Sequence, residues 1–257
     1  MPSLVIELSF VGTNFHGWQF QPGLRTIQGE LERALKTVTN KELRVVGCCR
    51  TDAGVHARQY LASCNLDHPL DLERLKRALN GVLPKDIRVL SLELKERFNA
   101  RFDTISKLYS YCILTAPDPF LAPYCLLINR PIDIDLLSRS WGSYIGLHDF
   151  RSFCKIEPGK STLIFIDQAI TIASGKAIFL KIRASHFLRY MVRRLVGCSI
   201  ALSQNRLSID NFKSALTGEK VCPFCAPPHG LTLEQVIPRT KPPLIKGFPN
   251  DDKVSNI

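Results

Sequence analysis

Hydrophobic residues in the first part of the chain recur with two different periods. From Leu4 to Val11 they alternate with other residues, which predicts a strand, because successive strand side chains point to opposite faces. After Thr26, a residue type that caps helices, they recur at helical spacing and form the stripe Ile27, Leu31, Ala34 and Leu35. The same patterns predict strands over residues 44–49, 59–66 and 87–94, and a second helix that Asp71 caps and Asn80-Gly81 stops.

The second part of the chain also mixes strands with helices. Alternation predicts a strand from Lys107 to Leu114, and a hairpin of residues 164–172 and 177–183 around Ser174-Gly175. Caps and apolar stripes predict three more helices: one from Asp135 through Trp141 to about Gly146, one from Ser185 through Met191 and Leu195, and one over 209–216 between Ser208 and Gly218.

These elements indicate an α+β protein. We expect two similar mixed lobes with largely antiparallel sheets, helices packed on one face and a cleft between the lobes. The expected lobes are residues 1–103 and 104–240, followed at 241–257 by a tail rich in Pro, Lys and Asp that we expect to be mobile. Nothing indicates a dinucleotide-binding unit, because no Gly-x-Gly-x-x-Gly follows a predicted strand.

The charge balance indicates a partner. The chain has 34 Lys and Arg against 23 Asp and Glu, which gives a net charge of +11 over 257 residues. Nucleic acid is the first partner to consider, because Lys and Arg bind it by neutralising phosphates. A basic surface that serves only solubility is the alternative. The hydrophobic fraction of 45% supports a substantial core.

The chain shows no sign of a membrane or secreted protein. No apolar stretch is long enough to span a bilayer, and residues 1–7 lack the features of a signal peptide, so we expect a cytoplasmic location. The chain has nine cysteines. Most of them lie in apolar surroundings, and we interpret them as reduced core residues; examples are Cys64, Cys112, Cys154 and Cys198.

One cysteine pair has the spacing of a metal site. Cys222-Pro223-Phe224-Cys225 is followed by His229, but a closed zinc site needs a fourth ligand. A single Cys-x-x-Cys is weak support by itself, so we predict no metal and no redox role here.

Asp52 is the strongest candidate for chemistry. It lies in Arg50-Thr51-Asp52-Ala53-Gly54-Val55-His56-Ala57, on a turn-prone segment between two predicted strands and two residues from Arg50. A carboxylate is a nucleophile or a base only while ionised, and a nearby cation favours that form. The alternative is a turn aspartate that caps backbone amides. A hydrolase that uses Asp52 with His56 is a weaker alternative, because no Ser or Cys nucleophile accompanies them.

Seven other segments accompany this octet in a fixed order. They are Phe10–Gln19, Thr26–Glu32, Phe98–Phe102, Tyr109–Tyr111, His148–Phe153, Phe187–Arg193 and Ala226–Leu231. Together with the octet they resemble the sequence blocks of the tRNA pseudouridine synthase A family, over roughly residues 4 to 236.

The resemblance implies a role for each matching residue. Asp52 would be the catalytic nucleophile, and Arg193 would form an ion pair with it. Tyr109 would stack on the uracil and assist proton transfer, with Tyr111 as the alternative one strand repeat away. The predicted substrate-binding residues are Arg50, His56, Arg58, Tyr111 and Arg189, and a structural role is the alternative for His56.

Without the resemblance, these residues have plainer interpretations. Both tyrosines could simply pack on a strand. Arg189, Arg193 and Arg194 fall at helical spacing, so they could form a solvated helix face or contact phosphates.

The resemblance also implies a reaction and its partners. Uridine would be isomerised to pseudouridine in the anticodon stem-loop, at tRNA positions 38 to 40, without cofactor or metal. The N-glycosidic bond breaks, the base turns, and a carbon–carbon bond forms through C5, which requires the base to leave its stack. The implied partners are tRNA and a second subunit in a homodimer. A non-catalytic RNA-binding protein on the same fold is the alternative, and such a relative would be expected to lose Asp52 or Arg193.

The chain departs from the family pattern at a few positions. Cys49 stands where a glycine usually precedes Arg-Thr-Asp, and Asn99 replaces a frequent histidine. Arg189-Tyr190 and Arg194 vary the residues around Met191-Val192-Arg193. These departures concern substrate contacts more than chemistry.

Overall fold

A computed structural model of the chain describes residues 2–66 and 71–239. Its strands are β1 (Ser3–Phe10), β2 (Val46–Gly47), β3 (His56–Asn65), β4 (Ile87–Lys95), β5 (Thr104–Leu114), β6 (Leu126–Leu127), β7 (Gly146–Asp149), β8 (Leu163–Ser174), β9 (Ala177–Ala184) and β10 (Leu231–Pro238). They form one sheet in the order β4-β1-β3-β10-β5-β9-β8-β7, with β2 beside β3 and β6 beside β5. Pairing is antiparallel except between β10 and β3 and between β6 and β5.

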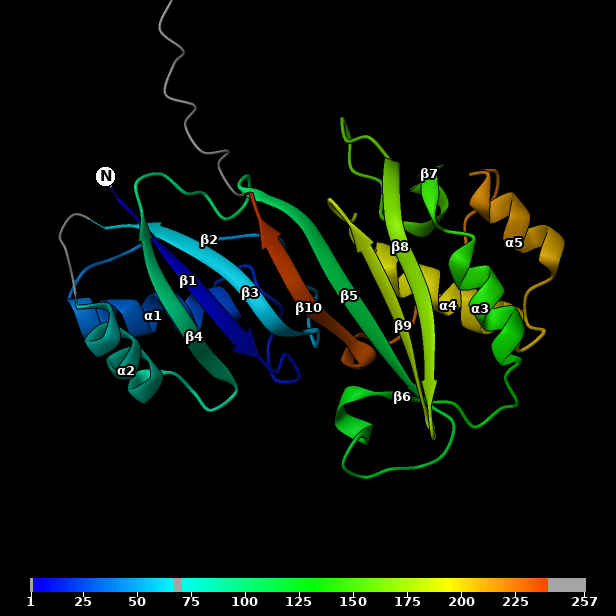
Figure 1. Ribbon diagram of the computed structural model, residues 1–257, viewed down its shortest axis with the longest axis horizontal. Helices are drawn as coiled ribbons and strands as arrows, with labels where there is room; N and C mark the ends of the chain where they lie inside the picture. The colour runs from blue at the N-terminus through cyan, green and yellow to red at the C-terminus, as the bar shows by residue number, and fades with distance from the viewer. Residues whose placement is uncertain (1, 67–70, 240–257) are drawn as a thin grey trace, which may run out of the picture.

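A group of helices accompanies each end of the sheet (Figure 1). Helices α1 (Ile27–Thr39) and α2 (Leu72–Val82) lie beside β1, β3 and β4. Helices α3 (Ile134–Gly142), α4 (Met191–Ser203) and α5 (Ile209–Leu216) lie at the end that holds β7, β8 and β9. Short 3-10 helices form at η1 (Ala122–Tyr124), η2 (Phe150–Phe153) and η3 (Pro228–Gly230). Strands β10 and β5 therefore lie between the two helical groups.

The helices cover one face of this sheet. Side chains that are paired between neighbouring strands lie on this face and are buried. From β1 to β8 they are Leu8 and Tyr60, then Ala57, Leu233, Tyr109, Ile182 and Ala169. This confirms the α+β class with helices on one face. The lobe boundary at residues 103 and 104, and the cleft between lobes, stay predictions. The expected tail at 241–257 lies outside the described residues.

Three predicted helix starts are confirmed by their caps. The side chains of Thr26, Asp71 and Ser208 each accept a hydrogen bond from the backbone amide three residues later. Each bond satisfies an amide that the first turn of a helix leaves without a partner. The predicted hairpin around Ser174-Gly175 is also confirmed, as β8 and β9.

The helix predicted to open at Ser185 begins only at Met191. Strand β9 extends to Ala184, and Tyr190 has a φ of +65°, a left-handed conformation that cannot continue a right-handed helix. Arg189 therefore lies before α4, and the interpretation that placed it on one helix face with Arg193 and Arg194 is wrong.

Other boundaries also differ from prediction. Helix α2 passes through Asn80-Gly81, because the Asn80 side chain bonds both backbone groups of Val89, and it ends at Val82, just before Leu83-Pro84. Helix α3 starts earlier than predicted, because the carboxylate of Asp133 caps it, and it ends earlier, at Gly142. The strand predicted over 44–49 is reduced to β2.

The cysteine interpretation needs one correction. Cys112 and Cys125 form a disulfide, with their Cα atoms 4.7 Å apart, so Cys112 is not a reduced core residue. Parallel pairing sets Leu126 opposite Ile113 and thus brings Cys125 beside Cys112, a contact that the sequence spacing does not indicate. The remaining cysteines are free. Within residues 2–66 and 71–239, no helix has the length and apolar character needed to cross a membrane.

Candidate active site

Asp52 lies on the turn that joins β2 to β3. The amide of Val55 closes the turn by donating to the Asp52 carbonyl over 3.2 Å, and Gly54 adopts a φ of +79°. The turn is held from outside by Trp18, whose amide donates to the Thr51 carbonyl. Gly17 has a φ of +84°, and a Cβ on it would lie 2.5 Å from that carbonyl oxygen, so only glycine fits there. The backbone that carries Asp52 is therefore fixed on both sides.

Arg193, in the first turn of α4, meets Asp52. Its Nη1 donates to Oδ2 of Asp52 over 3.1 Å, and the side chains are 16% and 25% exposed, respectively. A second bond runs from Nε of Arg193 to the Ala226 carbonyl over 2.8 Å. Two bonds from one planar guanidinium fix its orientation and place its charge beside the Asp52 carboxylate.

Tyr109, on β5, belongs to the surroundings of Asp52. Its ring stands edge-on to Phe187 at a centroid distance of 5.3 Å, and its hydroxyl lies 3.6 Å from Sγ of Cys49. Burial raises the pKa of Tyr109, and Cys49 and the charge of Asp52 act in the same direction. The phenol therefore stays protonated at neutral pH.

Tyr111 points to the same face as Tyr109 but is committed to the backbone. It is fully buried, and its hydroxyl donates to the Pro227 carbonyl over 2.9 Å. Its ring also packs closely on Gly230, where a Cβ would lie 2.6 Å from Cζ of the tyrosine. Of the two candidate tyrosines, Tyr109 is the one whose hydroxyl is held by no backbone group among these contacts.

His56 is enclosed by backbone groups. Its Nδ1 accepts from the Gly12 amide over 3.0 Å, so Nε2 carries the proton and donates to the His229 carbonyl over 3.0 Å. The side chain is buried, and this burial lowers the pKa of His56. These contacts favour a structural role, and the role of His56 in binding substrate stays a prediction. Both ring nitrogens are hydrogen-bonded to backbone groups, so neither is free to act with Asp52 as in the hydrolase alternative.

The predicted substrate-binding arginines occupy different places. Arg189 is exposed, with its guanidinium 5.0 Å from the ring centre of Tyr190. Arg50 is also exposed, and together with Arg189 it helps lower the pKa of Glu157, although the bond from Lys160 contributes most. Arg58 instead pairs with Glu234 over 3.2 Å. His56, two residues before it on β3, lies on the sheet face opposite to that of Tyr109.

Sequence reasoning missed two residues beside this site. Lys107 is buried on the same strand face as Tyr109, and its Nζ donates to the Ser185 carbonyl over 3.1 Å. Its period-two spacing from Tyr109 was a usable signal. Cys49 was noted only as a departure from the family pattern, yet its sulfur reaches the Tyr109 hydroxyl. Within the described ranges, no three His, Cys, Asp or Glu side chains gather as metal ligands.

Comparisons with known proteins identify relatives of this chain. A family model described as tRNA pseudouridine synthase matches residues 142–237, which contain Arg193. The tRNA pseudouridine synthase A of Aquifex aeolicus (strain VF5) is 41% identical over 92% of this chain and 100% of that protein. The proteins of the same name from Hydrogenobaculum sp. (strain Y04AAS1) and Moorella thermoacetica are 35% and 38% identical, each over 92% of this chain and 99% of the relative.

A chain from a solved Cbf5-Nop10-Gar1 complex aligns with a TM-score of 0.30 and 11% identity, over 76% of this chain and 54% of that chain, a likeness too low to establish a common fold. The sequence relatives are far closer and extend over nearly their whole length, with Asp52, Tyr109 and Arg193 inside the matched part. The chain therefore belongs to the tRNA pseudouridine synthase family.

Proposed function

We propose that the chain isomerises uridine to pseudouridine in the anticodon stem-loop of tRNA, with Asp52, Tyr109 and Arg193 as its catalytic residues. The observation that carries this proposal is the ion pair between Arg193 and Asp52, in which the arginine is also held by the Ala226 carbonyl. The chain's membership in the tRNA pseudouridine synthase family supports the reaction class.

The reaction needs an ionised carboxylate at the target nucleotide. The bond from N1 of uracil to the sugar breaks, a bond from C5 to the same sugar carbon forms, C5 loses a proton and N1 gains one. The Arg193 guanidinium pairs with the Asp52 carboxylate and holds it in one orientation. Attack on the sugar, attack on the base and removal of a sugar proton all require this carboxylate, so the geometry serves each of these routes.

Tyr109 supplies an aromatic face and a hydroxyl beside the carboxylate. Because burial raises its pKa, the phenol is neutral and can act as a hydrogen-bond donor to the turning base. A flipped base gains stacking on an aromatic ring in place of the stacking it leaves.

Exposed arginines and the overall charge suit an RNA substrate. Arg50 and Arg189 are exposed near the same carboxylate, Glu157, and the net charge of +11 favours binding to phosphates. A non-catalytic RNA-binding protein would have no need for the fixed Arg193–Asp52 pair. We place the protein in the cytoplasm with its tRNA substrate.

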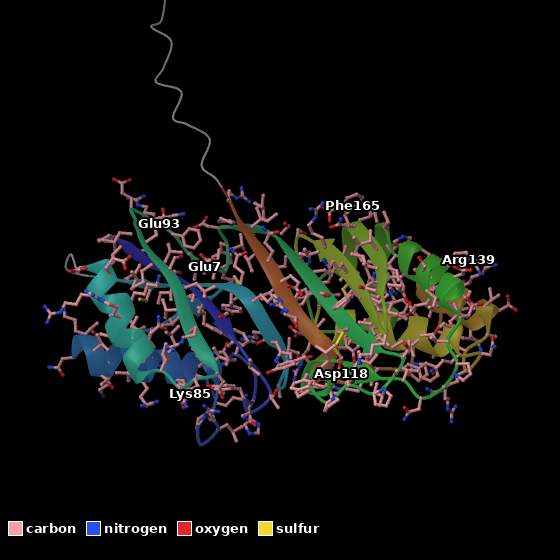
Figure 2. All side chains as sticks on the ribbon, turned by 60° about the horizontal axis from the view of Figure 1, so that its bottom comes forward. Glu7, Lys85, Glu93, Asp118, Arg139 and Phe165 are labelled. Carbon is pink, nitrogen blue, oxygen red and sulfur yellow. A yellow bond between two sulfur atoms is a disulfide. The ribbon has the colours of Figure 1, made fainter. Side chains whose placement is uncertain are left out.

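Pairing of two subunits has a candidate surface. On the face of β7 and β8 away from the helices, five large apolar side chains are 40% to 59% exposed: Leu147, Leu163, Phe165, Ile170 and Ile172. Phe165 projects at the margin of the molecule (Figure 2). Large exposed apolar side chains gathered on one sheet face are typical of an interaction site, and two copies of one face can meet in a twofold homodimer.

The decisive experiment is release of tritium from C5 of labelled uridine in unmodified tRNA. The wild-type protein should release tritium, and Asp52→Asn, which keeps the side-chain shape but not its charge, should not. Binding of tRNA to the variant should persist, because phosphate contacts dominate affinity. Turnover by Asp52→Asn near the wild-type rate would contradict the assignment.

A further inference from the structure

Residues 224–230, here called the strap, connect the region after α5 to the start of β10. The Cys222-Pro223-Phe224-Cys225 sequence, whose spacing resembled that of a metal site, leads into this strap. Its Ala226 makes a reciprocal pair of hydrogen bonds with Arg193. The Ala226 amide donates to the Arg193 backbone carbonyl over 2.9 Å, and the Ala226 carbonyl accepts from Nε of Arg193 over 2.8 Å.

The strap is anchored to three other parts of the site. The Pro227 carbonyl accepts from the Tyr111 hydroxyl over 2.9 Å, and the His229 carbonyl accepts from Nε2 of His56 over 3.0 Å. Pro228 packs against the Asp52 turn, since a Cβ on Gly54 would lie 3.0 Å from its Cγ. The strap thus spans the interval between the turn that carries Asp52 and the helix that carries Arg193.

Gly197 decides how closely the strap approaches α4. It lies one helical turn after Arg193, in the interior of α4. A Cβ at this position would lie 2.9 Å from the backbone nitrogen of Cys225, 2.9 Å from the carbonyl carbon of Phe224 and 3.0 Å from the backbone nitrogen of Ala226. These atoms are backbone and cannot rotate away as a side chain can, so any larger residue must push the strap off the helix.

Displacing the strap would release the arginine. Arg193 has one bond to Asp52 and one to the strap. If the Ala226 carbonyl withdraws, Nε loses its partner and the guanidinium can rotate about its flexible stem, so Nη1 is no longer held at Asp52. The charge would remain nearby, but its direction would not be fixed.

We propose that the strap is the element that orients Arg193 toward Asp52, and that Gly197 is a positioning residue for the reaction because it admits the strap. This inference rests on the proposed function, in which the Arg193–Asp52 pair is catalytic. Gly197 and the strap act through the guanidinium and not on the reacting base.

The test is Gly197→Ala, with Gly81→Ala as the matched control. Gly81 also lies inside a helix, but a Cβ there would meet nothing within 4 Å. With enzyme in excess over tritium-labelled tRNA, Gly197→Ala should lower the single-turnover rate roughly 10²-fold, as a displacement of about 1 Å can do. The dissociation constant for tRNA should be unchanged, and Gly81→Ala should react at the wild-type rate.

A double-mutant cycle separates positioning from general damage. Arg193→Lys keeps the charge but removes the planar fork that the strap holds. In that background Gly197→Ala should lower the rate by less than about threefold, because both changes act on the same interaction. A fall of equal size in both backgrounds, or none in the wild-type background, would overturn the proposal.

Two further measurements keep the outcome clear. Rates are normalised to the folded fraction measured by circular dichroism. If Gly197→Ala does not fold, Gly230→Ala displaces the strap from its other end, against the Tyr111 ring, and should show the same dependence on Arg193. Absence of tritium release by the wild-type protein would overturn the proposed function itself. An active wild-type protein with an equal single-turnover rate for Gly197→Ala would overturn only the proposal that the strap positions Arg193.

Discussion

Arg193 and Asp52 are 141 positions apart in the sequence, yet Nη1 of one lies 3.1 Å from Oδ2 of the other. The sheet makes this contact possible, because β10 returns from the end of the chain to pair with both β3 and β5. The turn before β3 and the strap before β10 are thereby brought together, and the Ala226 carbonyl of the strap accepts a hydrogen bond from Arg193 of α4.

Arg193 should matter far more than its neighbours. Arg193→Ala should lower the single-turnover rate by about 10²-fold or more, which corresponds to about 2.7 kcal/mol of transition-state stabilisation. Arg194, whose Nη1 donates to the Cys154 carbonyl, and exposed Arg189 are the comparison substitutions. Equal small losses for all three alanine variants would instead indicate a phosphate-binding surface.

Phenylalanine substitutions at Tyr109 and Tyr111 should have different effects, the first on the reaction rate and the second on the free energy of unfolding. Tyr109→Phe removes a hydroxyl whose hydrogen-bond partner among residues 2–66 and 71–239 is the Cys49 sulfur, and should lower the rate about 10²-fold with little change in unfolding free energy. Tyr111→Phe leaves the Pro227 carbonyl unpaired and should cost about 1–3 kcal/mol of stability. Urea unfolding and tritium release measure both variants. A larger rate loss for Tyr111→Phe that persists in the Arg193→Lys background would favour Tyr111 as the catalytic tyrosine, because a loss through the strap would not persist there.

His56 should make stability depend on pH below neutrality. The unfolded chain protonates this histidine near pH 6.5, whereas burial lowers the pKa of His56 in the folded protein. Between those values the unfolded state binds more protons, so stability falls as pH falls, by at most about 1.4 kcal/mol per pH unit. His56→Gln offers an acceptor and a donor without titrating. Between pH 7.5 and 5.5, urea unfolding should show a larger fall in unfolding free energy for the wild-type protein than for His56→Gln. Equal falls in the two proteins would contradict a buried neutral His56.

Phe165 should report on subunit pairing. Phe165→Glu places a charge in the exposed apolar row of β8 and should halve the molar mass seen by light scattering at micromolar concentration. Phe102→Glu, at another exposed phenylalanine, should leave the mass unchanged. A monomeric wild-type protein would contradict the proposed homodimer. A monomeric variant that modifies tRNA at the full rate would show that the reaction does not require a cleft shared by two subunits.

The sequence by itself determined the local elements and the candidate chemistry. Period-two and helical patterns located β1, α1, β8, β9 and α5, and the residues Thr26, Asp71 and Ser208 marked helix starts, because these signals depend on neighbours within a few positions. The Asp52 segment indicated a candidate nucleophile through its own residues and its resemblance to one family.

The tertiary structure decided which distant groups meet. Tyr109 and Tyr111 have the same period-two position, so only their places beside Cys49 and beside the strap distinguish them. The pairing of β6 with β5 joined Cys112 to Cys125, and the left-handed Tyr190 removed Arg189 from α4. Sequence periodicity reports which face a residue occupies, whereas contacts between residues far apart depend on strand order and register, which the packing of the whole chain sets.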